Sequence, residues 1–369
     1  MVPVNPYQNM QQITVGIYPY GDRGNPYQAV IAKTLTGQGL NCIKLQKSNF
    51  LPLYKSVRQP IDVLQIYWPH SMFTGATLMR GLIKKTLYSI DLNSLKRKKT
   101  VFSAENLYPH DSVNIQEDIR YTQKILDACK GILFMSEQSR QIYQTIYRLP
   151  ESTVQAVIPH IHYLDTYANT VTHEEARNHL GIPDGKKVIL FLGALRPYKG
   201  LVSLIKSFAH VSTENDCLVI AGMAKDEAFA AELNAMNLNP SSVGKGEVKI
   251  FNRFIPDDEL QYFYQACDAV AIPYDDMPIN PGSLILAMGF GKCIIAPLKG
   301  AIPELVCADA LFGYDEQETG ALAAALFSFL SSTGWAAKGI QNKTRVLERH
   351  SPQVAGQKYV EFYTKLFSV

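Results

Sequence analysis

The sequence predicts an α/β fold built from two doubly wound domains, and three observations support this prediction. The chain has 369 residues, more than a single domain usually contains. Short, continuously apolar runs alternate with amphipathic segments of helical period, which is typical of parallel strands covered by helices on both faces. A composition that is 47% hydrophobic and 19% charged supports a large core and argues against general disorder.

The second half of the chain shows this alternation most clearly. Its first apolar run leads through Gly193 into a segment whose apolar residues, from Leu201 to Phe208, fall on one helix face. Acidic residues after Pro256 favour the first turn of another helix. The runs predicted as strands are 187–192, 217–221, 247–251, 269–273, 293–296 and 311–314. The segments predicted as helices are 201–208, 225–236, 256–267 and 282–290.

The first half repeats the pattern less regularly. Its predicted strands are 13–18, 42–45, 63–68, 100–103, 131–135 and 154–158, and its predicted helices are 27–37, 76–90, 114–128 and 136–147. A polar stretch, 159–185, ends in a Pro-Asp-Gly turn signature and indicates the domain boundary, so we expect domains at 1–165 and 180–350. The two domains are expected to face each other across a cleft between the carboxyl ends of their sheets, because open α/β sheets bind ligands at such places.

Composition and charge exclude several classes. No apolar run is long enough to span a membrane, and residues 1–12 lack a secretory signal pattern, so a cytoplasmic protein is expected. The six cysteines are scattered without zinc spacing, and no metal is expected. The formal charge of +3 gives no reason to expect a nucleic-acid partner. Residues 1–165 nevertheless carry 18 basic and 11 acidic side chains, against 18 and 22 in the remainder.

Two loops of the second half are candidates for binding a diphosphate. Arg196 and Lys199 follow the predicted strand 187–192, where a planar fork of donors and a mobile ammonium suit phosphate oxygens. Gly282-Ser283-Leu284 opens a predicted helix, and free N–H groups at a helix start attract phosphate. The alternatives are a solvated loop with ordinary surface charges and an ordinary helix entry.

Proton-handling residues follow the predicted strand 100–103. Glu105, His110 and Asp111 could each remove a proton from an attacking hydroxyl. The alternative is that Asp111 caps the next helix and His110 is a polar loop residue. The pair His160 and His162 lacks a third metal ligand of convincing spacing, so structural or substrate hydrogen bonding is favoured.

With these residues in place, the chain resembles GT-B glycosyltransferases of the family 4-like superfamily. The resemblance is carried by FLGALRPYKGLVSLIKSF from Phe191, by FIPDDELQYFYQACDAVAIPY from Phe254 and by PGSLILAMGFGKCIIAPLKGAIPELV from Pro281. It implies two Rossmann-like domains, with the nucleotide-sugar donor on the second and the final segment, 352–369, packing back on the first. It also implies donor contacts at Arg196, Lys199, Gly282, Ser283 and Leu284, and nucleotide or sugar contacts at Gly193, Gly222, Phe254, Ile255, Tyr274 and Glu304.

The sequence departs from the usual family pattern at two points. Ala194 stands where the family usually has Arg, and Leu286 stands where a Glu would bind ribose. A closer likeness is to inverting mannosyltransferases of xanthan-type exopolysaccharide assembly, through Asn25-Pro26-Tyr27, the segment 63–69, Asn106-x-x-Pro109-His110 and Arg196-Pro197-Tyr198-Lys199-Gly200.

That likeness implies transfer of mannose from GDP-mannose, or of a sugar from a UDP-sugar, in bacterial cell-surface polysaccharide synthesis. The acceptor would be lipid-linked or an oligosaccharide, contacted by Asn25, Tyr27 and His160, and no further cofactor is expected. His110 is the first choice as base, and Asp111 or Glu105 are the alternatives. Two other classes stay open: a nucleotide-sugar epimerase on the same fold, and a non-catalytic nucleotide-sugar-binding subunit.

A basic amphipathic segment, 78–99, needs a separate explanation. Stretch 80–99 holds seven basic residues against one acidic residue, Asp91, and an apolar stripe runs through its helical part. Such a helix can lie on an anionic membrane surface. The alternative is a helix whose apolar stripe faces the core and whose basic face is solvated.

Overall fold

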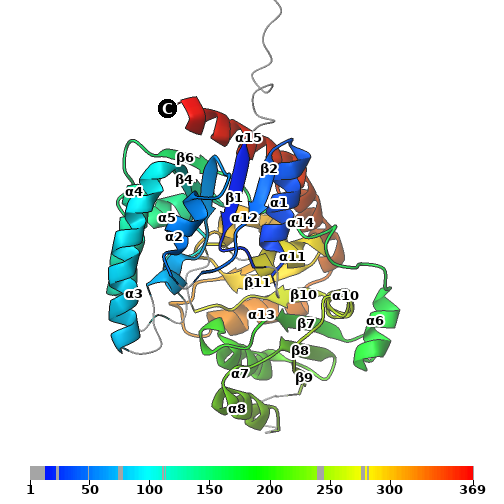
Figure 1. The fold of residues 1–369 in the computed structure, drawn as a ribbon. Coiled ribbons are helices and arrows are strands. Elements are labelled where there is room, and N and C mark those ends of the chain that lie inside the picture. Colours follow the sequence, from blue (N-terminus) through cyan, green and yellow to red (C-terminus); the bar gives the residue numbers. More distant parts are fainter. Residues whose placement is uncertain are drawn as a thin grey trace, which may run out of the picture. The chain divides into compact units, whose positions relative to one another are not determined.

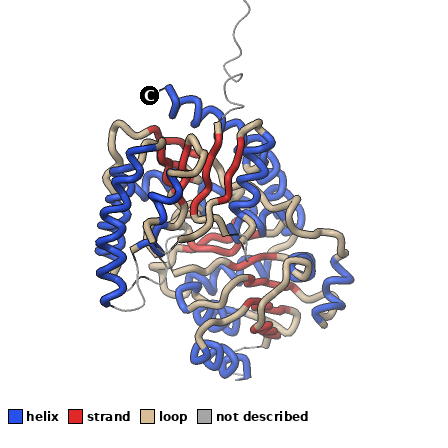
Figure 2. Tube along the Cα trace, viewed as in Figure 1, coloured by secondary structure: helices blue, strands red, loops and turns tan. Residues whose placement is uncertain are grey.

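The computed structural model describes residues 13–21, 25–48, 50–73, 78–109, 112, 114–238, 245–275, 279–280 and 282–368 (Figures 1 and 2). The chain forms two compact units. The first unit comprises Met1–Ile161 and His350–Val369, and the second comprises His162–Arg349. Each unit is built around one six-stranded sheet whose described pairings are all parallel. The predicted α/β class is therefore confirmed.

The sheet of the first unit has the strand order β2-β1-β3-β4-β5-β6. Its strands are β1 (Thr14–Tyr18), β2 (Asn41–Lys44), β3 (Val63–Ile66), β4 (Lys99–Ser103), β5 (Gly131–Phe134) and β6 (Val154–Val157). Its helices are α1 (Tyr27–Gly37), α2 (Pro52–Val57), η2 (Pro69–Met72), α3 (Leu78–Asp91), η3 (Leu92–Arg97), α4 (Ile115–Ala128), α5 (Glu137–Ile146) and α15 (Pro352–Ser368).

The last helix, α15, is part of the first unit although it follows the whole second unit in the chain (Figure 1). It packs against α1 and β6. A Cβ on Gly131 would lie 2.6 Å from the ring of Phe362, so a glycine at the start of β5 lets this helix approach closely. The Lys99 ammonium donates to the Leu366 carbonyl at 2.6 Å and caps the last turn of α15.

The sheet of the second unit has the order β12-β11-β10-β7-β8-β9. Its strands are β7 (Lys187–Leu192), β8 (Asp216–Gly222), β9 (Glu247–Asn252), β10 (Ala269–Ala271), β11 (Cys293–Pro297) and β12 (Leu311–Tyr314). Its helices are α6 (His173–Leu180), η4 (Pro197–Lys199), α7 (Leu201–Val211), α8 (Glu227–Leu238), α10 (Leu260–Ala266), α11 (Gly282–Gly289), α12 (Ile302–Leu305), η5 (Ala308–Ala310), α13 (Ala321–Ser331) and α14 (Trp335–Arg349).

Strand β7 shows why its sequence is apolar from Val188 onward. Val188 and Leu190 belong to the hydrophobic core on one face of the sheet, and Ile189 and Phe191 belong to the core on the other face. Because successive strand side chains point to opposite faces, both sets must be apolar when helices cover both faces.

Several segments differ from the sequence predictions, among them helices α2, α13 and α14, which were not predicted. The stretch 159–185 contains helix α6, which begins with a reciprocal capping box between Thr172 and Glu175 and packs against α10. Strand β3 ends at Ile66, before Trp68 takes a φ of 41° at the entry to η2. Strand β10 ends at Ala271, before Pro273, which has no N–H for the ladder.

Candidate functional site

The second unit has a topological switch point between β7 and β10. From β7 the sheet grows to β8 and β9 on one side and to β10, β11 and β12 on the other. Loops that leave neighbouring strands in opposite directions open a crevice at the carboxyl ends of those strands, where such sheets bind ligands. The loop 193–200 after β7 and the loop 272–275 after β10 both begin at this crevice.

Glycines allow the backbone around this crevice to pack closely. A Cβ on Gly222 would lie 1.9 Å from the Gly193 carbonyl oxygen, and a Cβ on Gly200 would lie 1.9 Å from the Pro273 carbonyl oxygen. Gly200 has a φ of 68° and Gly222 a φ of 146°, conformations that favour glycine. The Asp275 N–H donates to the Tyr198 carbonyl at 2.9 Å, so the two loops are also hydrogen-bonded to each other.

Three predicted residues meet at this crevice. The Lys199 ammonium lies 5.1 Å from the centroid of the Tyr274 ring and 5.8 Å from that of the Phe191 ring. A Cβ on Gly193 would lie 3.2 Å from the Lys199 Nζ. The Tyr274 hydroxyl and the Ser283 Oγ are hydrogen-bonded at 3.0 Å. The Lys199 ammonium thus lies near the Tyr274 ring, and the hydroxyl of that ring is bonded to Ser283. A cation with neighbouring hydroxyls is a combination that suits phosphate oxygens.

The other predicted donor residues of the second unit are in different environments. Arg196 is half-buried at the start of η4, within the same loop as Lys199. The Gly282 N–H already donates to the Asn280 carbonyl at 3.1 Å. Leu284 is fully buried, so only its backbone could meet a ligand.

Residues predicted to contact the base or sugar also differ in exposure. Phe254 is 60% exposed, whereas the neighbouring Ile255 is 8% exposed and packs in the hydrophobic core. Glu304 is exposed on α12. The structure thus leaves Phe254 accessible as a flat surface and uses Ile255 for core packing.

In the first unit, only one of the three candidate bases can be described. Glu105 is 3% exposed just after β4 and accepts a hydrogen bond from the Ser103 hydroxyl at 2.7 Å. His110 and Asp111 lie outside the described residues.

A buried polar cluster that the sequence reasoning did not identify adjoins Glu105. The Gln65 amide donates to the Tyr67 hydroxyl at 2.6 Å, and the Tyr363 hydroxyl donates to the Gln65 carbonyl at 2.5 Å. Burial raises the pKa of Tyr67 well above its ordinary value, and the nearby Tyr359 and Glu105 raise it further. A glutamine inside the apolar run of β3 was the available sequence signal, because buried amides require partners.

The predicted acceptor-side residues form part of the structure around the start of α1. The Asn25 side chain accepts a hydrogen bond from the Tyr27 N–H at 3.0 Å. The rings of Tyr27 and His160 stack, with centroids 4.5 Å apart, and both are buried. The His160 ring bonds the Ile161 carbonyl at 2.8 Å, and burial lowers the pKa of His160 to about 3.

The described residues offer neither a metal-binding cluster nor a helix able to cross a membrane. Within the described ranges, no three His, Cys, Asp or Glu side chains gather closely enough to hold a metal ion. Every helix in the described part of the chain falls short of the length and apolarity needed to cross a bilayer.

The chain is similar to known glycosyltransferases. Residues 172–346, almost the whole second unit, match the family model described as Glycosyl transferases group 1. The chain is 24% identical over 246 residues to the lipopolysaccharide 1,2-N-acetylglucosaminetransferase of Salmonella typhimurium, covering 62% of this chain and 63% of the relative. It is 25% identical over 248 residues to an uncharacterized glycosyltransferase of Methanocaldococcus jannaschii, covering 66% and 60%. The matched region thus spans less than two thirds of either relative's length.

Solved structures extend the fold similarity to nearly the whole chain. Sucrose-phosphate synthase from Thermosynechococcus elongatus superposes with a TM-score of 0.75 at 15% identity, over 97% of this chain and 99% of that one. HepE of Anabaena, in complex with UDP and glucose, superposes with a TM-score of 0.69 at 16% identity, over 96% and 99%. The predicted GT-B architecture is thereby confirmed. The family match supports the glycosyltransferase group 1 assignment and the prediction of an enzyme of that class.

Proposed function

We propose that the chain is a glycosyltransferase that moves a sugar from a nucleotide-diphosphate sugar to a lipid-linked or oligosaccharide acceptor. The observation that carries this proposal is the position of Lys199 near the ring of Tyr274, whose hydroxyl is bonded to Ser283, at the β7–β10 switch point. The match of the second unit to the group 1 family model and the names of its relatives support the same reaction class.

In the proposed reaction, Lys199 and Arg196 neutralise the leaving diphosphate. A first-unit base takes the proton of an acceptor hydroxyl, and the oxygen forms a bond to the anomeric carbon. The bond from that carbon to the diphosphate breaks, and its electron pair leaves with the phosphate oxygen. Negative charge develops on the leaving phosphate, and preorganised cations at that place lower the barrier. In our proposal Lys199 and Arg196 supply this positive charge, and no cofactor besides the donor is invoked.

His110 stays our first choice as base, with Asp111 and Glu105 as alternatives. The Ser103 hydroxyl donates to one carboxylate oxygen of Glu105 and fixes its orientation, which supports Glu105 as an alternative. Attack by the deprotonated acceptor from the opposite side of the sugar would invert its anomeric configuration.

The donor and the biological setting are finer parts of the proposal. GDP-mannose is favoured by the xanthan-type motifs, and a UDP-sugar is the alternative, as HepE was crystallised with UDP. We propose cell-surface polysaccharide synthesis at the cytoplasmic side of the membrane as the setting. Incubation with radiolabelled GDP-mannose or UDP-sugars and membrane lipid extract tests these assignments. Labelled lipid supports transfer, whereas rearranged donor without acceptor would indicate an epimerase.

Lys199→Ala is the direct test of the diphosphate assignment. Its turnover should fall by about a hundredfold, the scale for losing one transition-state charge contact. Lys206→Ala is the matched control, because Lys206 is an exposed lysine on α7, the helix that follows this loop. Near-normal turnover in Lys199→Ala would remove the assignment.

We further propose peripheral membrane contact through α3. Four large apolar side chains of this helix are 54–73% exposed: Met79, Leu82, Ile83 and Ile90. The apolar stripe thus does not face the core, and a helix lying in a bilayer interface would bury it. Leu82→Ser/Ile83→Ser should weaken cosedimentation with anionic vesicles. Ile340→Ser/Leu347→Ser on α14, with 60% and 48% exposure, is the matched control and should not.

A further inference from the structure

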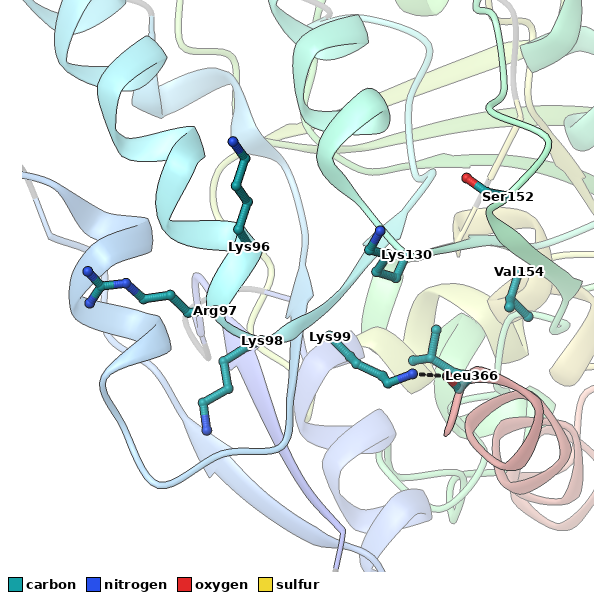
Figure 3. Close-up of a pocket in the computed structure, with 8 residues that line it drawn as sticks. All are labelled: Lys96, Arg97, Lys98, Lys99, Lys130, Ser152, Val154 and Leu366. Carbon is teal, nitrogen blue, oxygen red and sulfur yellow. Dashed lines mark hydrogen bonds between the residues drawn. The ribbon is translucent and has the colours of Figure 1, made fainter. Parts of the chain in front are cut away.

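The first unit contains a strongly cationic pocket of about 390 Å³ (Figure 3). Its walls include five basic side chains and one hydroxyl, and none of its lining residues is acidic: Lys96, Arg97, Lys98, Lys99, Lys130 and Ser152. Such a concentration of one sign of charge raises the electrostatic potential inside a concave surface and attracts counter-ions.

The pocket lies at the amino ends of three neighbouring strands. Lys99 begins β4, Lys130 immediately precedes β5, and Ser152 lies just before β6. Glu105 follows the opposite end of β4, and a five-residue strand is roughly 13 Å long between its first and last Cα atoms. The donor cations proposed above, Arg196 and Lys199, belong to the second unit. The pocket therefore lies at the opposite end of the first unit's strands from Glu105, and none of the proposed donor residues lines it.

Contacts within the protein engage only some of this charge. Lys99 donates to the Leu366 carbonyl and lies 5.3 Å from the Phe367 ring centroid, and Arg97 lies 5.4 Å from the Tyr54 ring centroid. The carboxyl ends of α4 and α15, beside Lys130 and Lys99, together contribute roughly one negative charge. Five cations thus retain an excess of about four positive charges.

Three ammonium groups are available to a ligand. Among the described residues, no ion pair or hydrogen bond engages the ammonium group of Lys96, Lys98 or Lys130. In Figure 3, Lys96 and Lys98 extend in opposite directions from one short segment, and Lys130 stands apart at the start of β5. Charges spread around a rim suit several phosphate groups better than one.

We propose that this pocket binds a ligand carrying two or more phosphate groups, supplied by clustered lipid headgroups or by a soluble polyphosphate. Its ligand would bind without being consumed, and the assignment does not depend on glycosyl transfer. It also differs from the apolar contact proposed for α3, because it requires cations at the amino edge of the sheet.

Inorganic tripolyphosphate in isothermal titration calorimetry and vesicles of phosphatidylcholine with phosphatidylglycerol in cosedimentation test the two sources. Lys96→Glu/Lys130→Glu should weaken binding of at least one probe about tenfold or more, since each basic residue near an anionic surface contributes strongly. Both lysines are exposed, so the variant should fold, which its thermal unfolding checks. Lys33→Glu/Lys206→Glu makes the same change in net charge at exposed positions of α1 and α7.

Each outcome decides the proposal. Loss of tripolyphosphate binding in the pocket variant alone supports a soluble ligand, and loss of vesicle binding alone supports headgroups. The proposal is overturned if neither probe binds, if both double variants lose binding equally, or if tripolyphosphate binding disappears in Lys199→Ala and survives in the pocket variant. Vesicle binding that survives the pocket variant and is lost in Leu82→Ser/Ile83→Ser would assign membrane contact to α3 only.

Discussion

Gly200→Ala tests whether the loop that carries Lys199 is held against the end of β10. The new Cβ would lie 1.9 Å from the Pro273 carbonyl oxygen, whereas real Cβ contacts essentially never fall under 3.0 Å. The loop or the strand end must therefore move by about 1 Å, and such a misplacement can cost about a hundredfold in rate. Overpacking of this kind destabilises a fold by about 1–3 kcal/mol.

A matched variant separates this clash from the cost of the backbone conformation. Gly181 has a φ of 61°, close to the 68° of Gly200, but the nearest atom to its added Cβ is the Lys249 Nζ at 3.9 Å. In both variants, placing alanine in the left-handed backbone conformation costs about 1–2 kcal/mol. Gly181→Ala should therefore lower the free energy of unfolding by about 1–2 kcal/mol, and Gly200→Ala by about 2–5 kcal/mol.

Tryptophan fluorescence during urea unfolding measures this difference. The chain has two tryptophans, and Trp335 belongs to the second unit, so a Trp68→Phe background reports that unit alone. Turnover of each variant with the donor found in the screen gives the accompanying loss of activity. Equal destabilisation by Gly200→Ala and Gly181→Ala would refute the contact between the loop and Pro273.

Three further predictions concern stability. The pKa of His160 is lowered to about 3, so below pH 6.5 the unfolded state binds a proton that the folded state does not. The free energy of unfolding should therefore fall by about 2 kcal/mol from pH 7 to pH 5 because of this residue. In His160→Asn this part of the pH dependence should disappear, as urea unfolding at each pH would measure. Tyr363→Phe leaves the buried Gln65 carbonyl without its 2.5 Å donor and should cost about 1–3 kcal/mol, whereas an unchanged urea midpoint would contradict the network. Arg177→Met leaves the buried Asp268 carboxylate without its ion-pair partner at 3.2 Å, with the Val188 N–H still bonded to it, and should cost about 3–5 kcal/mol, a loss that Arg177→Met/Asp268→Leu should largely restore.

Local patterns predicted most of the sheet architecture. The strands predicted at 187–192 and 311–314 have the observed bounds, and the helix predicted at 27–37 is α1. The strand at 187–192 is readable because a strand covered on both faces must be apolar along its buried length. Helix α6 was missed, although Thr172 and Glu175 form a capping box, because its surrounding stretch is polar and short.

Sequence position also predicted that three candidate donor residues would lie near one another. Lys199, Tyr274 and Ser283 are 75 and 9 residues apart in the chain, yet each follows a strand or begins a helix at the same sheet edge. The burial of Ile255 could not be predicted from its loop, since it depends on which neighbours fill the core above β7. The exposure of Met79 and Leu82 could not be predicted either, because an apolar stripe on a helix can face a hydrophobic core or an interface.

Helix α15 links features of the first unit that no local sequence pattern connects. Near its beginning, the His350 ring bonds the His160 carbonyl at 2.8 Å. Tyr363 in the same helix holds Gln65, whose amide holds Tyr67 beside Glu105, and three residues later the Leu366 carbonyl accepts from Lys99 at the cationic pocket. The helix is one rigid hydrogen-bonded element. Its docking therefore holds in place both the carboxyl ends of the first unit's strands, where Glu105 lies, and their amino ends, where the cationic pocket lies. A change that undocks α15 should therefore disturb the candidate base and the pocket in one step, whereas Lys96→Glu/Lys130→Glu should affect the pocket alone.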